Sequence, residues 1–303
     1  MKDERGFALV ITLLITALLV ALSVEFVDEV FVDTSARQNF TDGQQASIMA
    51  GSGIDFAIKG LQMSLAGRTY NSLGDIWAQP FKKEDEQGTL LVTIEDESGK
   101  LNLNQIFGPN GQVLFPKYRD IAVRLFKKLG LSPDLLDALA DWVDDRAVSP
   151  HPAGAKSPYY NTLKPPYDVK SSKLDTVEEL ALVKGFDART VQMLRPYVTI
   201  YSDAPGLINI NTAPKEVIAA LDDAMTDSLT KQVLDYRKTT PFQDKSDLVK
   251  VPEMGTFATS LSTSTTTQGT AYRILSTATV NETTRTVEAV VQTGGQILYW
   301  REY

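Results

Sequence analysis

The first 24 residues constrain this chain more than any other segment. A short charged leader, residues 1–6, is followed by residues 7–24, in which no side chain carries a charge. These 18 residues approach the roughly 20 that a helix needs to cross a lipid bilayer. The segment therefore predicts that the rest of the chain works tethered to a membrane or is delivered through one.

Three interpretations of residues 7–24 can be compared. A cleaved secretory signal needs a small-x-small site after its apolar core, and residues 23–29 offer no good one. A buried helix of a soluble protein normally carries a polar stripe, which this run lacks. A retained anchor fits best. Because Lys2 and Arg5 precede the run and no Lys or Arg follows it before Arg37, the N-terminus is predicted to be cytoplasmic.

Composition excludes several kinds of chemistry. The 303 residues include no cysteine and one histidine, His151, which lies in a proline-rich loop where we expect it to be solvated. Thiolate catalysis, disulfides and cysteine-based zinc sites are therefore excluded. The formal net charge of −8 disfavours a general phosphate-binding surface. No nucleophile–base cluster is recognisable, so we expect no enzymatic activity.

The helical pattern continues well beyond the apolar run. Residues such as Ile54 and Leu61 maintain an apolar stripe at helical spacing up to about residue 65. This pattern predicts one very long helix, apolar all round in its first half and amphipathic in its second. The alternative is two shorter helices joined at Gly43 or Gly51.

The remaining pattern is mixed. Segments rich in β-branched residues predict strands at 89–95, 272–280, 284–292 and 297–300, the middle two as a hairpin. Residues 70–86 are predicted to be a loop, and residues 116–251 are mainly helical in pattern. The simplest architecture is one sheet packed on the long helix, with a helical domain inserted between its strands.

Part of the helical block is similar to known small modules. Residues 174–186 and 242–254 form a weak internal repeat, and residues 207–217 resemble the opening of a helix-hairpin-helix module. The expected hairpin, residues 221–225, has no glycine and contains Asp222 and Asp223. These acids would repel phosphate, so we expect a structural module that binds no nucleic acid.

Three carboxylates mark the helical block. Asp141, Asp144 and Asp145 are spaced by three and four residues, which places them on one helical face. Such like charges repel unless a cation offsets them, and an oxygen-ligated ion such as calcium is the candidate in a chain with one histidine. The alternative is a solvated helix end, with Arg146 as the offsetting charge.

Taken together, the motifs resemble the K-class minor pseudopilins of the type II secretion system. They occur in the order of that family at residues 5–7, 96–104, 140–144, 176–186, 196–200 and 208–213. The resemblance implies an α+β, pilin-like fold, in which a long N-terminal helix packs on an antiparallel sheet, with a large inserted α-helical domain.

The resemblance also implies a division of the chain. Residues 1–6 are the prepilin leader, and residues 7–24 form a transmembrane and filament stem helix. Residues 25–105 and 260–303 form the pilin-like α+β domain. Residues 106–259 form the inserted α-helical domain, with two small helix-hairpin-helix-like modules.

Processing and filament position follow from the same resemblance. It implies cleavage by the prepilin peptidase between Gly6 and Phe7 and methylation of the Phe7 amine. Most pilins have Glu at the fifth mature position, whereas this chain, like others of the K class, has a residue without charge there, Ile11. A buried Glu is costly unless it meets the N-terminal amine of a neighbouring subunit, and a subunit at the tip has no neighbour ahead of it.

The family carries calcium in its helical domain, near a loop that often reads Gly-Ala-Glu. This chain has Gly154, Ala155 and Lys156 there, so a cation replaces an expected ligand. Calcium held by Asp141, Asp144 and Asp145 remains the candidate cofactor.

The expected function is that of a non-enzymatic minor pseudopilin at the tip of the pseudopilus, which initiates pseudopilus assembly and supports export across the outer membrane. Its expected partners are the minor pseudopilins of the I, J and H classes and the prepilin peptidase. It would cross the bacterial inner membrane once, with most of the chain in the periplasm. The alternatives are a minor pilin of a type IV pilus, a membrane-tethered DNA-uptake receptor and a calcium-dependent membrane hydrolase.

Overall fold

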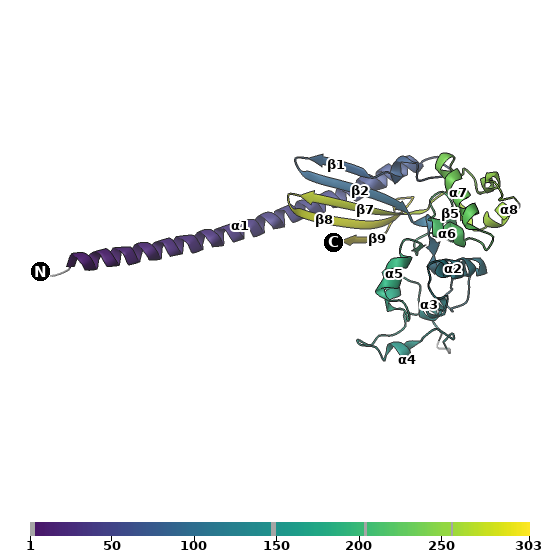
Figure 1. Ribbon diagram of the computed structural model, residues 1–303, viewed down its shortest axis with the longest axis horizontal. Helices are drawn as coiled ribbons and strands as arrows, with labels where there is room; N and C mark the ends of the chain where they lie inside the picture. The colour runs from purple at the N-terminus through teal and green to yellow at the C-terminus, as the bar shows by residue number, and fades with distance from the viewer. Residues whose placement is uncertain (1–3, 147–149, 203–204, 256) are drawn as a thin grey trace.

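A single helix, α1 (Glu4–Leu65), dominates the shape of the molecule (Figure 1). The computed structural model describes residues 4–146, 150–202, 205–255 and 257–303, so the predicted leader, residues 1–6, lies partly outside the described residues. Because α1 continues without a break through Gly43 and Gly51, the prediction of one long helix is confirmed and the two-helix alternative is wrong.

The second half of α1 packs on a sheet. Its buried positions recur every three or four residues, which gives one apolar face: Ala46, Ala50, Ile54, Ala57 and Leu61. The small residues in this stripe let the helix approach the strands closely. This face and the sheet form one of the two hydrophobic cores, together with Trp77 and Tyr272.

The sheet has five antiparallel strands in the order β1-β2-β7-β8-β9. Their bounds are β1 (Phe81–Asp85), β2 (Gly88–Asp96), β7 (Ala271–Val280), β8 (Thr283–Gln292) and β9 (Ile297–Glu302). The predicted hairpin is confirmed: β7 and β8 pair from Ala271↔Gln292 to Val280↔Thr283. Asn281 makes the tight turn with a φ of 51°, a conformation that asparagine tolerates better than most residues.

The prediction of a loop over residues 70–86 is wrong in part. The segment contains the 3₁₀ turn η1 (Ile76–Ala78) and strand β1. All five side chains of β1 are exposed, so the strand has no apolar alternation that a sequence pattern could reveal. Its structure comes from pairing with β2, in the register Phe81↔Val92.

The helical part lies between β2 and β7 in the sequence. Its helices are α2 (Pro116–Lys128), α3 (Leu135–Val143), α4 (Ser157–Tyr160), α5 (Ala188–Leu194), α6 (Lys215–Ala220), α7 (Asp227–Thr239) and α8 (Phe257–Leu261). Short 3₁₀ turns punctuate it: η2 (Glu97–Gly99), η3 (Leu103–Gln105), η4 (Glu178–Leu182) and η5 (Lys245–Lys250). The two segments of the predicted repeat contain η4 and η5, each of which is followed by a short helix.

Two short parallel strand pairs hold the helical part together. They are β3 (Leu101–Asn102) with β4 (Val198–Thr199), and β5 (Ile208–Asn209) with β6 (Thr265–Thr266). The second hydrophobic core runs from Leu101 to Leu261 and lies wholly within this part. Figure 1 shows the helical part beyond and to one side of the sheet end that is farthest from the N-terminus. The predicted α+β fold is therefore confirmed.

A buried carboxylate joins the two parts. Asp96, the last residue of β2, accepts hydrogen bonds from Asn209 Nδ2 at 2.7 Å, Thr212 Oγ1 at 2.8 Å and the Ser98 backbone N–H at 2.8 Å. Asn209 Nδ2 also donates to Asn71 Oδ1 at 3.1 Å. One carboxylate thus fixes the sheet, the segment after α1 and the helical part at one point.

Candidate functional site: the stem and the aspartate cluster

The first half of α1 forms a stem that no described part of the chain covers. From residue 7 to residue 41 every side chain is exposed except that of Ser35, which is half-buried. Within the described part of the chain, α1 is long and apolar enough to cross a membrane, judged by length and composition. Thr16 and Ser23 donate their hydroxyls to the carbonyls of Thr12 at 2.9 Å and Leu19 at 2.7 Å, so these groups are satisfied within the helix.

The predicted processing residues lie at the start of this stem. The bond between Gly6 and Phe7 falls in the first turns of α1, and the Phe7 side chain is exposed. Ile11 follows one turn later on the same exposed stem. Cleavage at this bond stays a prediction.

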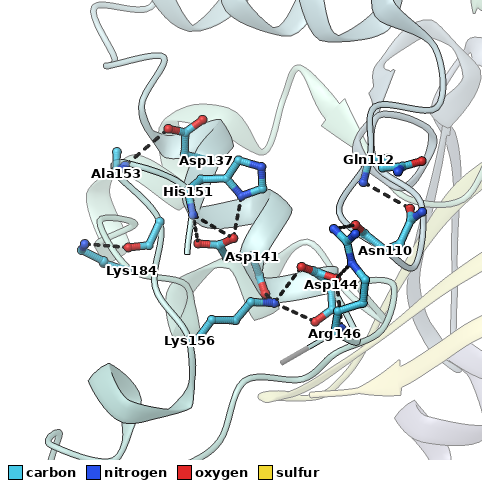
Figure 2. Close-up of polar contacts among 11 residues, drawn as sticks. Asn110, Gln112, Asp137, Asp141, Asp144, Arg146, His151, Ala153, Lys156 and Lys184 are labelled. Atoms are coloured by element: carbon cyan, nitrogen blue, oxygen red, sulfur yellow. Dashed lines mark hydrogen bonds and ion pairs between the residues drawn. The ribbon is translucent and has the colours of Figure 1, made fainter. Parts of the chain in front are cut away.

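The structure separates the three predicted aspartates. Asp141 lies in α3, Asp144 caps its C-terminal end, and both side chains are buried. Asp145 is exposed and does not share their buried environment. We call the buried pair and its three cationic or imidazole neighbours the aspartate cluster (Figure 2): Asp141, Asp144, Arg146, His151 and Lys156.

His151 holds Asp141. The His151 backbone N–H lies 3.0 Å from Asp141 Oδ2, and its ring Nδ1 lies 2.6 Å from Asp141 Oδ1. The His151 side chain is 41% exposed, which agrees with the expectation that it is solvated, but it also contacts a fully buried carboxylate, which was not expected. Gly154 leaves room for the Asp141 carboxylate, because a Cβ at this position would lie 1.8 Å from Asp141 Oδ2.

Arg146 and Lys156 hold Asp144. The Arg146 backbone N–H and Nε lie 3.0 and 3.1 Å from Asp144 Oδ1, and Lys156 Nζ lies 3.1 Å from Oδ2. Burial alone would raise the pKa of the Asp144 carboxyl, but the contacts with Arg146 and Lys156 outweigh it and lower this pKa below its ordinary value. Asp144 is therefore an ionised carboxylate whose Oδ1 accepts two hydrogen bonds from Arg146, while Oδ2 has, among the described residues, only the ion pair with Lys156.

These residues do not fit a calcium ion. Calcium takes six to eight oxygen ligands at about 2.3–2.6 Å. No group of three or more His, Cys, Asp or Glu side chains in the described ranges is placed to hold a metal. Lys156 Nζ already takes the backbone carbonyls of Asp141 and Asp144 and forms an ion pair with Asp144 Oδ2, which itself accepts no hydrogen bond from the described part of the chain. Lys184 Nζ takes the Gly154 carbonyl at 2.9 Å.

The hairpin of the helix-hairpin-helix-like segment is bound by the side chain of Arg124. It connects α6 to α7, and Arg124 of α2 donates to the carbonyls of Ala220 at 2.8 Å and Leu221 at 2.9 Å. Arg124 also pairs with Asp223 at 3.3 Å. The hairpin thus serves to dock α2, which agrees with the structural role expected for it.

Comparison with known proteins gives consistent matches. Two family models, both described as type II secretion system (T2SS), protein K, match residues 99–203 and 208–267. The type II secretion system protein K of Klebsiella pneumoniae is 31% identical over 268 residues, which cover 83% of this chain and 80% of that protein. The Pseudomonas aeruginosa protein of the same name is 28% identical over 266 residues, covering 82% and 77% of the two chains.

A solved structure shares the fold. A chain of the crystal structure of the GspK-GspI-GspJ complex from the enterotoxigenic Escherichia coli type 2 secretion system matches with a TM-score of 0.75. The match covers 89% of this chain and 99% of that chain, at 21% sequence identity. Long helix, sheet and helical part are therefore shared as one arrangement.

Proposed function

Since this chain belongs to the type II secretion system protein K family, we propose that it is the minor pseudopilin at the tip of the pseudopilus and initiates its assembly. In that role it supports the export of proteins across the outer membrane. The family consists of structural components of the secretion machinery, and we propose no catalytic activity for this member.

The bare stem carries the proposal. Residues 7–24 present apolar side chains on all sides of α1, with no contact to the rest of the chain. Such a surface needs a cover, which a bilayer supplies before assembly and neighbouring stems supply within a filament. A globular protein with a separate role in solution would have no use for this exposed helix.

The position of the helical part supports the tip over the shaft. It lies at the end of the sheet away from the stem and extends to one side of it (Figure 1). In a filament, another subunit placed ahead of this one, on the side away from the membrane, would have to occupy the space that the helical part fills. The uncharged Ile11 agrees with this placement, because a tip subunit has no amine ahead of it to pair with a carboxylate at that position.

We propose the following division of the chain: leader 1–6, stem 7–24, pilin-like domain 25–105 and 260–303, and inserted helical domain 106–259. The two separate hydrophobic cores support this division. The core of the helical domain begins at Leu101, a few residues before the proposed boundary.

The proposed partners are the minor pseudopilins of the I, J and H classes and the prepilin peptidase, which cleaves between Gly6 and Phe7. The similar E. coli structure is a complex of GspK with GspI and GspJ, which supports the first two classes. We propose a single pass through the bacterial inner membrane, with a cytoplasmic N-terminus and a periplasmic sheet and helical domain. Because the chain has no cysteine, one Cys introduced in the β7–β8 hairpin would test this by labelling with a membrane-impermeant thiol reagent.

Co-purification tests the central claim. The full-length chain is produced with its I- and J-class partners in cells that lack the major pseudopilin, and is purified in detergent. A stable ternary complex is expected, because an initiating subunit must assemble before the shaft. If the chain elutes without its I- and J-class partners under these conditions, the proposal is refuted. If the complex forms only when the major pseudopilin is present, the claim that this chain initiates assembly is refuted.

Two alternatives predict different outcomes. Membership in this family favours type II secretion over a type IV pilus. A DNA-uptake receptor would retain DNA on a filter at physiological salt, whereas the net charge of −8 and the acidic α6–α7 hairpin lead us to expect no retention above background.

A further inference from the structure

Three oxygen atoms converge on one ammonium group in the aspartate cluster. Lys156 Nζ donates to the backbone carbonyls of Asp144 at 2.9 Å and Asp141 at 3.2 Å, and lies 3.1 Å from Asp144 Oδ2 (Figure 2). The Lys156 side chain is 11% exposed, and the Asp144 side chain is fully buried. Two of the three N–H donors of the ammonium are therefore used by the carbonyls, and its charge is paired with Oδ2, which accepts no hydrogen bond within the described ranges.

We propose that the Lys156 ammonium group takes the place of a metal ion in the aspartate cluster, so that the helical domain of this chain folds and persists without calcium. Two carbonyls and a carboxylate are ligands that calcium prefers. Here the position between these three oxygens is occupied by the Lys156 ammonium group. Because this group is part of the chain, neither a chelator nor dilution can remove it.

The charges of the cluster balance without an ion. Asp141 and Asp144 supply two negative charges, and Arg146 and Lys156 supply two positive charges. A divalent cation added to this set would lie beside an ammonium and would leave a net positive charge in a mostly buried site. Replacement of Lys156 by glutamate changes the local charge by two, which is the charge that one calcium ion restores.

The contacts of the cluster also show what the lysine holds in place. Arg146 donates to the carbonyl of Asn110, and the Asp145 backbone N–H donates to that of Pro109 at 2.8 Å. Lys156 ties the end of α3 to the start of α4, on the other side of the proline-rich loop. A surface pocket of about 360 Å³, lined in part by Asp145, Arg146 and Lys156, borders the lysine from the solvent side. An ion could therefore reach the oxygens if the ammonium were absent.

The test compares three forms of the full-length chain in detergent by thermal unfolding, in EDTA and in millimolar calcium at equal ionic strength. We expect the wild-type Tm to be the same in both. Lys156→Met should lower the Tm by about 5 °C or more in both, because it leaves Asp144 partly unpaired. Lys156→Glu should be destabilised in EDTA and should regain most of the loss in calcium.

Lys173→Glu is the matched control, since this exposed lysine undergoes the same charge change outside the cluster. Its Tm should be close to that of the wild type and independent of calcium.

The proposal is overturned if calcium raises the wild-type Tm, if EDTA lowers it, or if Lys156→Met is as stable as the wild type. Elemental analysis gives an independent answer should the variants fail to fold. Wild-type protein purified in calcium and then desalted should retain far less than one calcium ion per chain. One bound calcium ion per chain would refute the proposal that Lys156 replaces the metal. Neither readout depends on secretion or on complex formation, so this inference and the proposed function can fail separately.

Discussion

Arg273 in the central strand β7 donates from Nε to Glu97 Oε1 at 2.8 Å, and so connects the sheet to η2, the first 3₁₀ turn of the helical part. The same guanidinium pairs with Glu288 of β8, and Lys100 Nζ donates to Glu97 at 2.8 Å. Both glutamates are buried. An ion network therefore joins the sheet to the start of the helical part.

Loss of Arg273 should destabilise the whole chain. Arg273→Met removes one cation from two buried carboxylates, and breaking a buried pair in this way costs about 3–5 kcal/mol. Lys231→Met is the control, because it breaks the exposed 2.6 Å pair with Asp235, whose contribution to stability should be small because solvent screens it. Urea unfolding of both variants measures the difference, and equal losses would contradict the importance of the junction.

The same network predicts a pH dependence. Burial alone would raise the pKa of Glu97 and of Glu288, but Arg273, with Lys100 at Glu97 and Tyr303 at Glu288, lowers both below the ordinary glutamate value. The unfolded chain then binds more protons than the folded chain near that value, so stability increases with pH there.

This contribution is complete above the ordinary glutamate pKa and is lost as the pH falls through the lower folded values. The difference in unfolding free energy between wild type and Arg273→Met should therefore shrink on acidification. If the difference in unfolding free energy stays constant from neutral to acidic pH, the pKa values of Glu97 and Glu288 are not lowered in the folded chain.

Alanine substitutions at two glycines of α1 should change the stability of the chain in opposite directions. A Cβ on Gly53 would lie 2.2 Å from Ser276 Oγ in β7, whereas a Cβ on Gly51 would meet no atom within 4 Å. Gly53→Ala should cost about 1–3 kcal/mol through overpacking. Gly51→Ala should stabilise the chain by up to about 1 kcal/mol, because alanine favours the helix. Thermal unfolding distinguishes them, and a destabilised Gly51→Ala would show that the outer face of α1 is not free.

Processing can be read directly from the mature protein. Mass spectrometry of the chain isolated from membranes should show methylated Phe7 as the first residue. The mass of a chain that still begins with Met1, or of one that begins near residue 23, would instead indicate no cleavage or a secretory signal.

Periodicity predicted the parts of this fold that have a regular apolar face. Helix α1 and the β7–β8 hairpin follow from spacing alone, because each buries one side against a partner. Strand β1 did not, because its side chains are all exposed and only its backbone pairing makes it a strand.

The aspartate cluster shows a similar limit. Spacing identified Asp141 and Asp144 as unusual, and the departure at Lys156 cast doubt on calcium. The contact of His151 with Asp141 could not be predicted, because the two residues are ten apart in the sequence and share no periodic pattern.

The neighbouring strands β2 and β7 are separated in sequence by the entire helical part, residues 97–270. During synthesis, α1 and β2 therefore emerge long before the strand that covers them. Because the helical domain has its own core, its folding would bring residues 101 and 261 together first and shorten the loop that the sheet must close. The strands β7 and β8, which follow the helical part in the sequence, then complete the surface on which α1 rests.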